Sequence, residues 1–215
     1  MKMTQTPAPK PPSAIRGLYA ITPDMVDTGR LCQLVEASLK GGAAVIQYRN
    51  KTADAALRLE QARRLLAPCR SYGVPLIIND HLDLCLALGA DGLHLGGEDG
   101  DIKAARQALG NKLLGVSCYN RFELAVAAKA RGADYVAFGS CFDSATKPAA
   151  VHAPLALLTQ AARELHLPVV AIGGVTQANA PLAIGAGADS IAVIGALFTA
   201  VDVQQAASQF SNLFK

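Results

Sequence analysis

Short runs of apolar residues that end abruptly at polar residues recur along the chain. Leu76–Ile78, for example, leads directly into Asn79 and Asp80. A short apolar run without alternation predicts a strand buried on both faces, which is typical of a parallel sheet. Eight such runs begin near Gly17, Ala44, Pro75, Gly92, Leu113, Tyr135, Pro168 and Ser190.

The segments between these runs are rich in good helix formers such as Ala, Leu, Arg, Gln and Glu. Residues 53–72 have the apolar spacing of an amphipathic helix, with Thr52 as its predicted N-cap. Glycine followed by alanine closes several of these segments, and such glycines favour a left-handed helix end. These closures lie at Gly41–Gly42, Gly89, Gly132 and Gly187.

This alternation predicts an α/β fold, a single-domain (β/α)8 TIM barrel over residues 17–215. Each strand and helix pair takes roughly 25 residues, so eight pairs fit the chain. An open doubly wound sheet would also alternate strands and helices. The barrel is favoured because polar groups follow nearly every strand. In parallel α/β folds, chemistry occurs at these carboxyl ends.

Composition narrows the function classes. A hydrophobic fraction of 51% and a charged fraction of 17% predict a well-filled core, and a formal charge of +3 gives no basic stripe for nucleic acid. No apolar stretch approaches the length of a membrane span. Residues 1–16 are proline-rich and lack the apolar core of a signal peptide, so we expect a flexible tail and a cytoplasmic protein. A homo-oligomer is compatible with the sequence, which does not specify one.

The five cysteines are scattered without metal-ligand spacing, which argues against disulfides and a zinc site. Cys118 and Cys141 lie near predicted strand ends. We interpret them as small buried apolar residues rather than nucleophiles. His94 alternates with Leu93 and Leu95, so we expect it inside the barrel or in the wall of the site.

Asp80 and Asp99 follow consecutive predicted strands, so both carboxylates can reach one hard cation. Magnesium takes few carboxylates and completes its shell with water and phosphate oxygens. The alternative is that each aspartate caps the helix that follows it, near His81 and near Ile102. The pairing of the two favours a Mg2+ site.

Gln47, Arg49 and Lys51 alternate after an apolar strand, which places their side chains on one face. Arginine offers a planar fork for phosphate, and lysine offers a mobile point charge. Lys147 ends a hydroxyl-bearing loop that contains Ser144 and Thr146. Solvated surface residues are the alternative for these cations.

Glycines end the seventh predicted strand and follow the eighth. Gly174 lets the backbone approach a ligand closely, and Ile194 and Gly195 follow strand eight. The loops after these two strands form the recurrent phosphate site of such barrels. Tight turns alone are the alternative explanation.

The ordered set of motifs resembles the thiamine-phosphate synthase family, also called thiamine-phosphate pyrophosphorylase, from about Gly17 to Leu197. The matching segments are Leu18–Thr22, Gln47–Lys51, Asn79–Asp80, Gly92–Gly96 with Asp99, Ser117, Thr146–Lys147 and Ile172–Gly174. The resemblance implies a transferase of thiamine biosynthesis that joins hydroxymethylpyrimidine diphosphate to thiazole phosphate, releasing pyrophosphate.

The resemblance also implies a role for each matching residue. The pyrimidine diphosphate is expected to meet Gln47, Arg49, Lys51, Asn79, Ser117 and Lys147. Of these, Arg49, Lys51, Ser117 and Lys147 are expected to be catalytic. Magnesium is expected at Asp80 and Asp99. The thiazole phosphate is expected to meet Ser144, Thr146, Gly174, Ile194 and Gly195.

The chain departs from the family pattern at Gly97, Ser144 and Gly195, where glutamine, threonine and serine are usual. Gly195 loses a hydroxyl donor, which concerns thiazole phosphate affinity more than the chemistry. The family's reaction is thought to be dissociative and needs no general base, in agreement with the lack of a nucleophile or a histidine–aspartate dyad. Three other functions remain open: a thiazole tautomerase of the same fold, a phosphosugar isomerase and a non-catalytic phosphate-ligand sensor.

Overall fold

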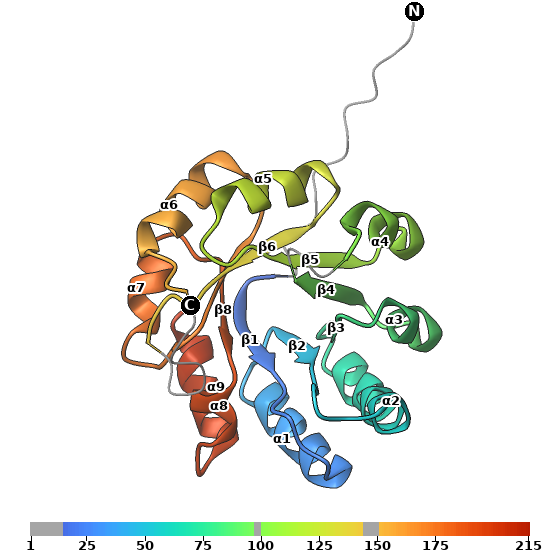
Figure 1. The fold of residues 1–215 in the computed structure, drawn as a ribbon. Helices are drawn as coiled ribbons and strands as arrows, with labels where there is room; N and C mark the ends of the chain where they lie inside the picture. Colours follow the sequence, from blue (N-terminus) through green and yellow to red (C-terminus); the bar gives the residue numbers. More distant parts are fainter. Residues whose placement is uncertain (1–14, 97–99, 144–150) are drawn as a thin grey trace, which may run out of the picture.

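A computed structural model of the chain describes residues 15–96, 100–143 and 151–215. In this part of the chain, parallel strands close into a barrel in sequence order, with helices around it (Figure 1). The closing pair is β1 with β8, which excludes the open sheet and confirms the (β/α)8 barrel. The strands are β1 (Gly17–Ile21), β2 (Val45–Tyr48), β3 (Leu76–Asn79), β4 (Gly92–Gly96), β5 (Leu113–Ser117), β6 (Tyr135–Phe138), β7 (Val169–Ile172) and β8 (Ser190–Val193).

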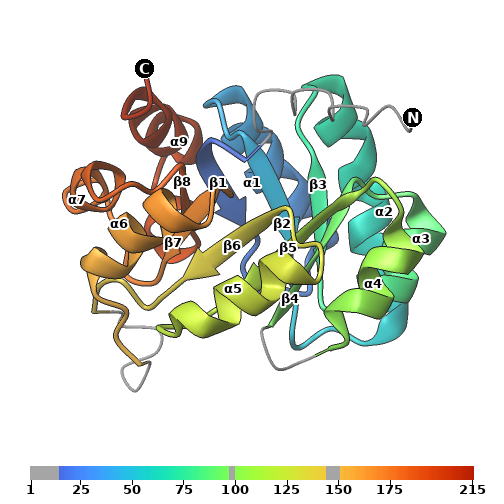
Figure 2. The same cartoon turned by 90° about the horizontal axis from the view of Figure 1, so that it is seen from above.

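Helices connect the strands and form the outer layer. They are α1 (Thr28–Lys40), α2 (Ala55–Ser71), α3 (Leu82–Leu88), α4 (Ile102–Leu109), α5 (Phe122–Ala130), α6 (Leu155–Glu164), α7 (Ala180–Gly185), the single turn α8 (Gly195–Phe198) and α9 (Val203–Asn212). The last helix, α9, packs against α1 and completes the ring (Figures 1 and 2). None of the helices in the described part of the chain has the length and hydropathy of a membrane span.

The apolar runs serve two cores, which explains why they do not alternate. The outward-facing residues of each strand pack against the helices in one large cluster. The inward-facing residues fill the barrel, as in other barrels of this type. This smaller cluster consists of Ile15, Tyr19, Ile21, Val45, Ile77, Tyr135, Ala137, Val170 and Ala192.

The predicted start of one helix needs correction. Helix α2 begins at Ala55 rather than Ala53, and its N-cap is Asp54, whose carboxylate accepts from the Leu57 amide. Thr52 instead donates its hydroxyl to Asn50 in the preceding loop. Gly89 ends α3 in the predicted left-handed conformation, with φ of 61°.

In the Gly41–Gly42 closure after α1, the predicted positive φ occurs at Gly42, with 91°, whereas the C-cap Gly41 has φ of −78°. A side chain at this position would collide with the Gln204 carbonyl and with Ala207 on α9. Close approach of α9 therefore accounts for this glycine. The predicted tail largely lies outside the described residues, but Ile15, which we assigned to it, is only 1% exposed and packs inside the barrel.

Candidate active site

Strand β2 and the loop after it carry the predicted trio. Gln47 points into the barrel, is 3% exposed and donates from Nε2 to the Tyr19 hydroxyl at 2.8 Å. Arg49 is half-buried, and its guanidinium lies 3.1 Å from the Asp24 carboxylate. Lys51 is exposed, and its backbone amide donates to the same Asp24 at 2.8 Å.

Asp24 and Thr22, which sequence reasoning missed, hold this loop. The buried Thr22 hydroxyl donates to the Arg49 carbonyl at 2.8 Å and accepts from the Arg49 amide at 2.9 Å. Asp24 binds both the side chain of Arg49 and the backbone of Lys51. Thr22 and Asp24, which follow β1, therefore hold the segment that carries Arg49 and Lys51. More than 20 positions separate the two segments, so no local sequence pattern reveals these contacts.

Asn50 shapes the rest of the same loop from within. Its side-chain oxygen accepts from the Thr52 and Ala53 amides, each at 3.2 Å. Its Nδ2 donates to the Met25 carbonyl and to Gln61 on α2. Asn50 is 5% exposed. It is therefore a structural residue of this loop.

Asn79 and Asp80 lie together at the carboxyl end of β3. Asn79 Nδ2 donates to Asp80 Oδ2 at 2.6 Å, and the Asp80 amide donates to the His94 carbonyl of β4 at 2.9 Å. Asp80 has a positive φ of 62°, and the N-cap of α3 is His81. The capping alternative is thus wrong for Asp80, whose exposed carboxylate has oxygen donors of the type that magnesium prefers.

The second predicted metal ligand, Asp99, lies outside the described residues. The N-cap of α4 is Asp101, whose carboxylate accepts from the Lys103 and Ala104 amides. Within the described residues, no three histidine, cysteine or acidic side chains cluster as a metal site. Gly97, Ser144, Thr146 and Lys147 also fall outside the described part.

Ser117 ends β5 and contacts His94 of the neighbouring strand. The distance from Ser117 Oγ to His94 Nε2 is 2.8 Å, and His94 Nδ1 lies 3.1 Å from the Tyr135 hydroxyl. Burial lowers the pKa of His94 from its ordinary 6.5 to about 4, so the imidazole is neutral at physiological pH. The prediction of an interior position for His94 is confirmed.

The backbone after β7 was predicted to approach a ligand closely. In the structure it lies close to the protein's own loop after β6. Gly173 and Gly174 have positive φ of 94° and 62°. A Cβ atom at Gly174 would collide with the carbonyls of Phe142 and Asp143, in the loop after β6. The Phe142 amide also donates to the Gly173 carbonyl at 3.0 Å. These glycines therefore join the loops after β6 and β7, and a contact of Gly174 with ligand stays a prediction.

After β8, Ile194 is the N-cap of the short turn α8, and Gly195 is its first residue. Gly195 is exposed, and a Cβ atom there would meet no atom of the described residues within 4 Å. The site thus has room for the side chain that the family usually has at this position.

The cysteines near the site have no thiolate character. Burial raises the pKa of Cys118 to about 12 and that of Cys141 to about 11. Both are buried and reduced. Because the thiolate is the nucleophilic form, the prediction that they are apolar packing residues is supported.

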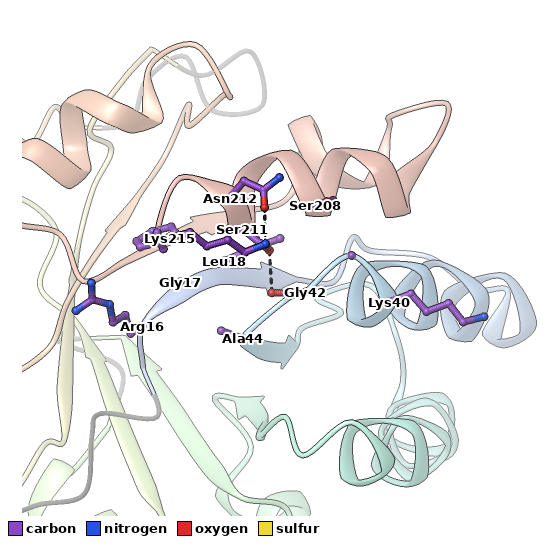
Figure 3. A pocket seen from close by; sticks show the side chains of 12 residues that line it. Arg16, Gly17, Leu18, Lys40, Gly42, Ala44, Ser208, Ser211, Asn212 and Lys215 are labelled. Carbon is purple, nitrogen blue, oxygen red and sulfur yellow. Dashed lines mark hydrogen bonds between the residues drawn. The ribbon is translucent and has the colours of Figure 1, made fainter.

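A cavity of about 380 Å3 lies at the opposite end of the barrel, beside the start of β1 (Figure 3). Its cations do not converge: Lys40 extends along α1 and pairs with Glu36 at 3.0 Å, and Lys215 binds Asn212 at 2.6 Å. Chemistry in this fold occurs at the carboxyl ends of the strands. We therefore place the active site at the other end, where Gln47, Arg49, Asn79, Asp80 and Ser117 lie.

Fold and site define a (β/α)8 barrel enzyme for phosphate-bearing ligands, with cations and carboxylates at the carboxyl ends of its strands. Residues 18–197 match the model of the thiamine monophosphate synthase family, and the chain belongs to that family. It is 55% identical to a thiamine-phosphate synthase of Aromatoleum aromaticum, covering 95% of this chain and 99% of the relative. It is 57% identical to one from Methylobacillus flagellatus, covering 93% and 96%.

A solved structure supports the same assignment. The thiamine phosphate pyrophosphorylase of Pyrococcus furiosus superposes with a TM-score of 0.83 at 35% identity, covering 92% of this chain and 94% of that one. The resemblance drawn from the sequence motifs is confirmed.

Proposed function

We propose that this protein is a thiamine-phosphate synthase, a transferase of thiamine biosynthesis. It joins hydroxymethylpyrimidine diphosphate to thiazole phosphate and yields thiamine phosphate and pyrophosphate. The observation that carries this proposal is the identity of more than half of all positions, over nearly the full length, with relatives of that name. The placement of Gln47, Arg49, Asn79 and Ser117 at the carboxyl ends of β2, β3 and β5 supports it.

The reaction breaks the bond between the pyrimidine methylene and a diphosphate oxygen, and the electron pair leaves with the diphosphate. Arg49, Lys51 and Lys147 neutralise the charge that builds on this leaving group. Asp24 holds Arg49 in place before the substrate binds. The thiazole nitrogen then attacks the methylene with its lone pair, so no general base is needed.

Asp80 and Asp99 would hold Mg2+. When bound, this ion would supply charge neutralisation at the diphosphate oxygens. The exposed Asp80 carboxylate at the end of β3, which does not cap α3, supports this proposal. Asn79 orients that carboxylate through its 2.6 Å hydrogen bond.

The thiazole phosphate is expected beyond β6, β7 and β8, near Ser144, Thr146, Gly174, Ile194 and Gly195. The joined loops after β6 and β7 and the open space at Gly195 support this placement. Cytoplasmic location and homo-oligomeric assembly stay predictions from the sequence.

The test is a pyrophosphate-release assay with both substrates, with each omitted in turn. Release that depends on both substrates, with thiamine phosphate formed in equal amount, is the expected result. Isomerisation of a thiazole phosphate without pyrophosphate release would instead indicate a tautomerase. The relatives' names and the retained Gln47, Arg49 and Asp80 argue against that alternative.

A further inference from the structure

A continuous hydrogen-bonded chain of side chains crosses the inside of the barrel. We call it the interior chain, and it consists of Gln47, Tyr19, Tyr135, His94 and Ser117 from β2, β1, β6, β4 and β5. Its successive links measure 2.8, 2.7, 3.1 and 2.8 Å. Its two ends are both expected pyrimidine-site residues, whereas its three central members are buried below the site.

The neighbours of Tyr135 show that this arrangement is built into the fold. Tyr135 is fully buried, and a Cβ atom at Gly115 of β5 would collide with its ring and hydroxyl. A glycine within a strand commonly marks such a close approach. Gly115 therefore leaves the space through which Tyr135 reaches His94 and Tyr19.

The donors and acceptors available at each hydrogen bond determine in which direction the interior chain donates its protons, from Gln47 toward Ser117. Gln47 Nε2 can only donate, so the Tyr19 oxygen accepts from it. The Tyr19 proton then finds an acceptor within the interior chain only at the Tyr135 oxygen, and a buried hydroxyl proton without an acceptor is costly, which favours donation from Tyr19 to Tyr135. The Tyr135 proton then goes to His94 Nδ1. A neutral histidine has one ring proton, which must therefore lie on Nε2 and donate to Ser117.

We propose that this direction prepares both ends of the interior chain for the substrate, an inference that rests on the proposed function. The Ser117 oxygen accepts from His94, so its own hydrogen is free to donate into the site. Gln47 uses its nitrogen within the chain, so its carbonyl oxygen is free to accept. An aminopyrimidine presents an amino hydrogen and a ring nitrogen, the complement of this acceptor and donor.

The opposite direction would require Gln47 to turn its amide over and accept from Tyr19. Ser117 would then donate to His94 and could offer a ligand only lone pairs. The orientation of the Gln47 amide therefore determines whether the Ser117 hydroxyl can donate to a ligand. Tyr19, Tyr135 and His94 act as positioning residues, since the proposal gives them no contact with the substrate.

The first test measures the tautomer of His94 by nitrogen NMR of histidine-labelled protein at neutral pH, with His94→Gln to assign its signals. The expected proton position is Nε2. Tyr135→Phe removes the donor to Nδ1, so the Nδ1-protonated form should become populated. Tyr48→Phe is the matched control: Tyr48 is 1% exposed and its hydroxyl donates to Gln61, outside the interior chain. A wild-type proton on Nδ1 would overturn the proposal.

The second test is a double-mutant cycle on the reaction. Tyr135→Phe should lower kcat/KM for the pyrimidine diphosphate about tenfold, as expected for a lost hydrogen bond, with KM for thiazole phosphate unchanged. In a Ser117→Ala background it should cause no further loss, because its effect passes through Ser117. Additive losses would refute this coupling.

Tyr19→Phe interrupts the interior chain one link earlier and replaces Tyr135→Phe if that variant does not fold. A wild-type protein without synthase activity would overturn the proposed function instead. The His94 tautomer would still decide the direction of the interior chain in that case.

Discussion

At the residue scale, the cations of the site are held by neighbours from another loop. Asp24 contacts the Arg49 guanidinium at 3.1 Å and the Lys51 amide at 2.8 Å, and Thr22 binds both backbone polar groups of Arg49. A group that is already oriented loses little freedom when a substrate binds. Under the proposed function, local order in this loop would help the enzyme stabilise the leaving diphosphate.

Replacement of Arg49 should lower the maximal rate. We expect Arg49→Ala to reduce kcat by about 10- to 100-fold, the range for a lost hydrogen bond to a charged group. Arg49→Lys should recover only part of this loss, because an ammonium cannot copy the two-pronged guanidinium. Steady-state kinetics with pyrophosphate detection measures both variants.

The control for this series is Arg163→Lys, at an exposed position near the end of α6. It should leave both Michaelis constants and kcat unchanged. If Arg49→Ala altered only the affinity for thiazole phosphate, Arg49 would belong to the other substrate's site.

Removal of the divalent cation should stop the reaction. We expect excess chelator to abolish activity and added Mg2+ to restore it. Asp80→Ala should lower kcat by at least about a hundredfold, since a bound metal contributes several kcal/mol at the transition state. Asp83→Asn, an exposed carboxylate in the first turn of α3, is the control and should remain active. Full activity in chelator would contradict the metal site.

At the element scale, the sequence predicted the strands well because both of their faces are apolar. All eight predicted starts fall within one residue of the observed ones, and five agree without shift: Gly17, Gly92, Leu113, Tyr135 and Ser190. Loop chemistry was harder to predict. Asp54 and Thr52 are both good N-caps, and only the bond from Thr52 to Asn50 shows why Asp54 has that role.

The site was predictable where a motif is local and not where contacts span loops. Gln47, Asn79 and Ser117 could be placed from the strand ends. Tyr19 and Tyr135 could not be assigned polar roles, because a tyrosine within an apolar run is expected to be a buried packing residue of the core. Their hydroxyls meet only because the closed barrel brings residues 116 positions apart to 2.7 Å.

The loops after β7 and β8 should respond differently to added side chains. Gly195→Ser should be tolerated and leave the KM for thiazole phosphate equal or lower, because open space surrounds the position and a hydroxyl can donate to phosphate. Gly174→Val should impair binding of that substrate, because the side chain would push against Phe142 and Asp143 and displace the loop after β6.

Gly73→Val is the control for the backbone conformation alone. Gly73 has φ of 65°, close to the 62° of Gly174, but a Cβ atom there would meet nothing within 4 Å. Gly73→Val should lower the free energy of unfolding and leave the KM for thiazole phosphate unchanged. Weak thiazole phosphate binding by Gly195→Ser would show that the loop after β8 is arranged differently from the family's.

At the scale of the whole molecule, the buried His94 makes the free energy of unfolding depend on pH. Its folded pKa is about 4 against 6.5 for the free group, so between these values the unfolded chain binds more protons. Stability should therefore fall as pH drops from about 6.5 to 4, by an amount on the order of 3 kcal/mol. Burial raises the pKa of the facing Tyr19 and Tyr135, which stay neutral throughout.

Urea unfolding of the wild type and of His94→Gln at several pH values measures this contribution. The variant should lose less stability on acidification, and the exposed His152→Gln should behave like the wild type. Parallel curves for wild type and His94→Gln would contradict a buried, neutral imidazole.

The packing of Ile15 bears on the route by which substrates enter the barrel and products leave it. Ile15 packs at the amino end of the barrel in one cluster with Val45 and Ile77, and the other inward-facing side chains of the cluster fill the centre above it. Under the proposed function, we expect substrates to enter and products to leave at the carboxyl end of the strands. Both substrates and both products would then share one opening, whereas the packed amino end serves only the stability of the barrel.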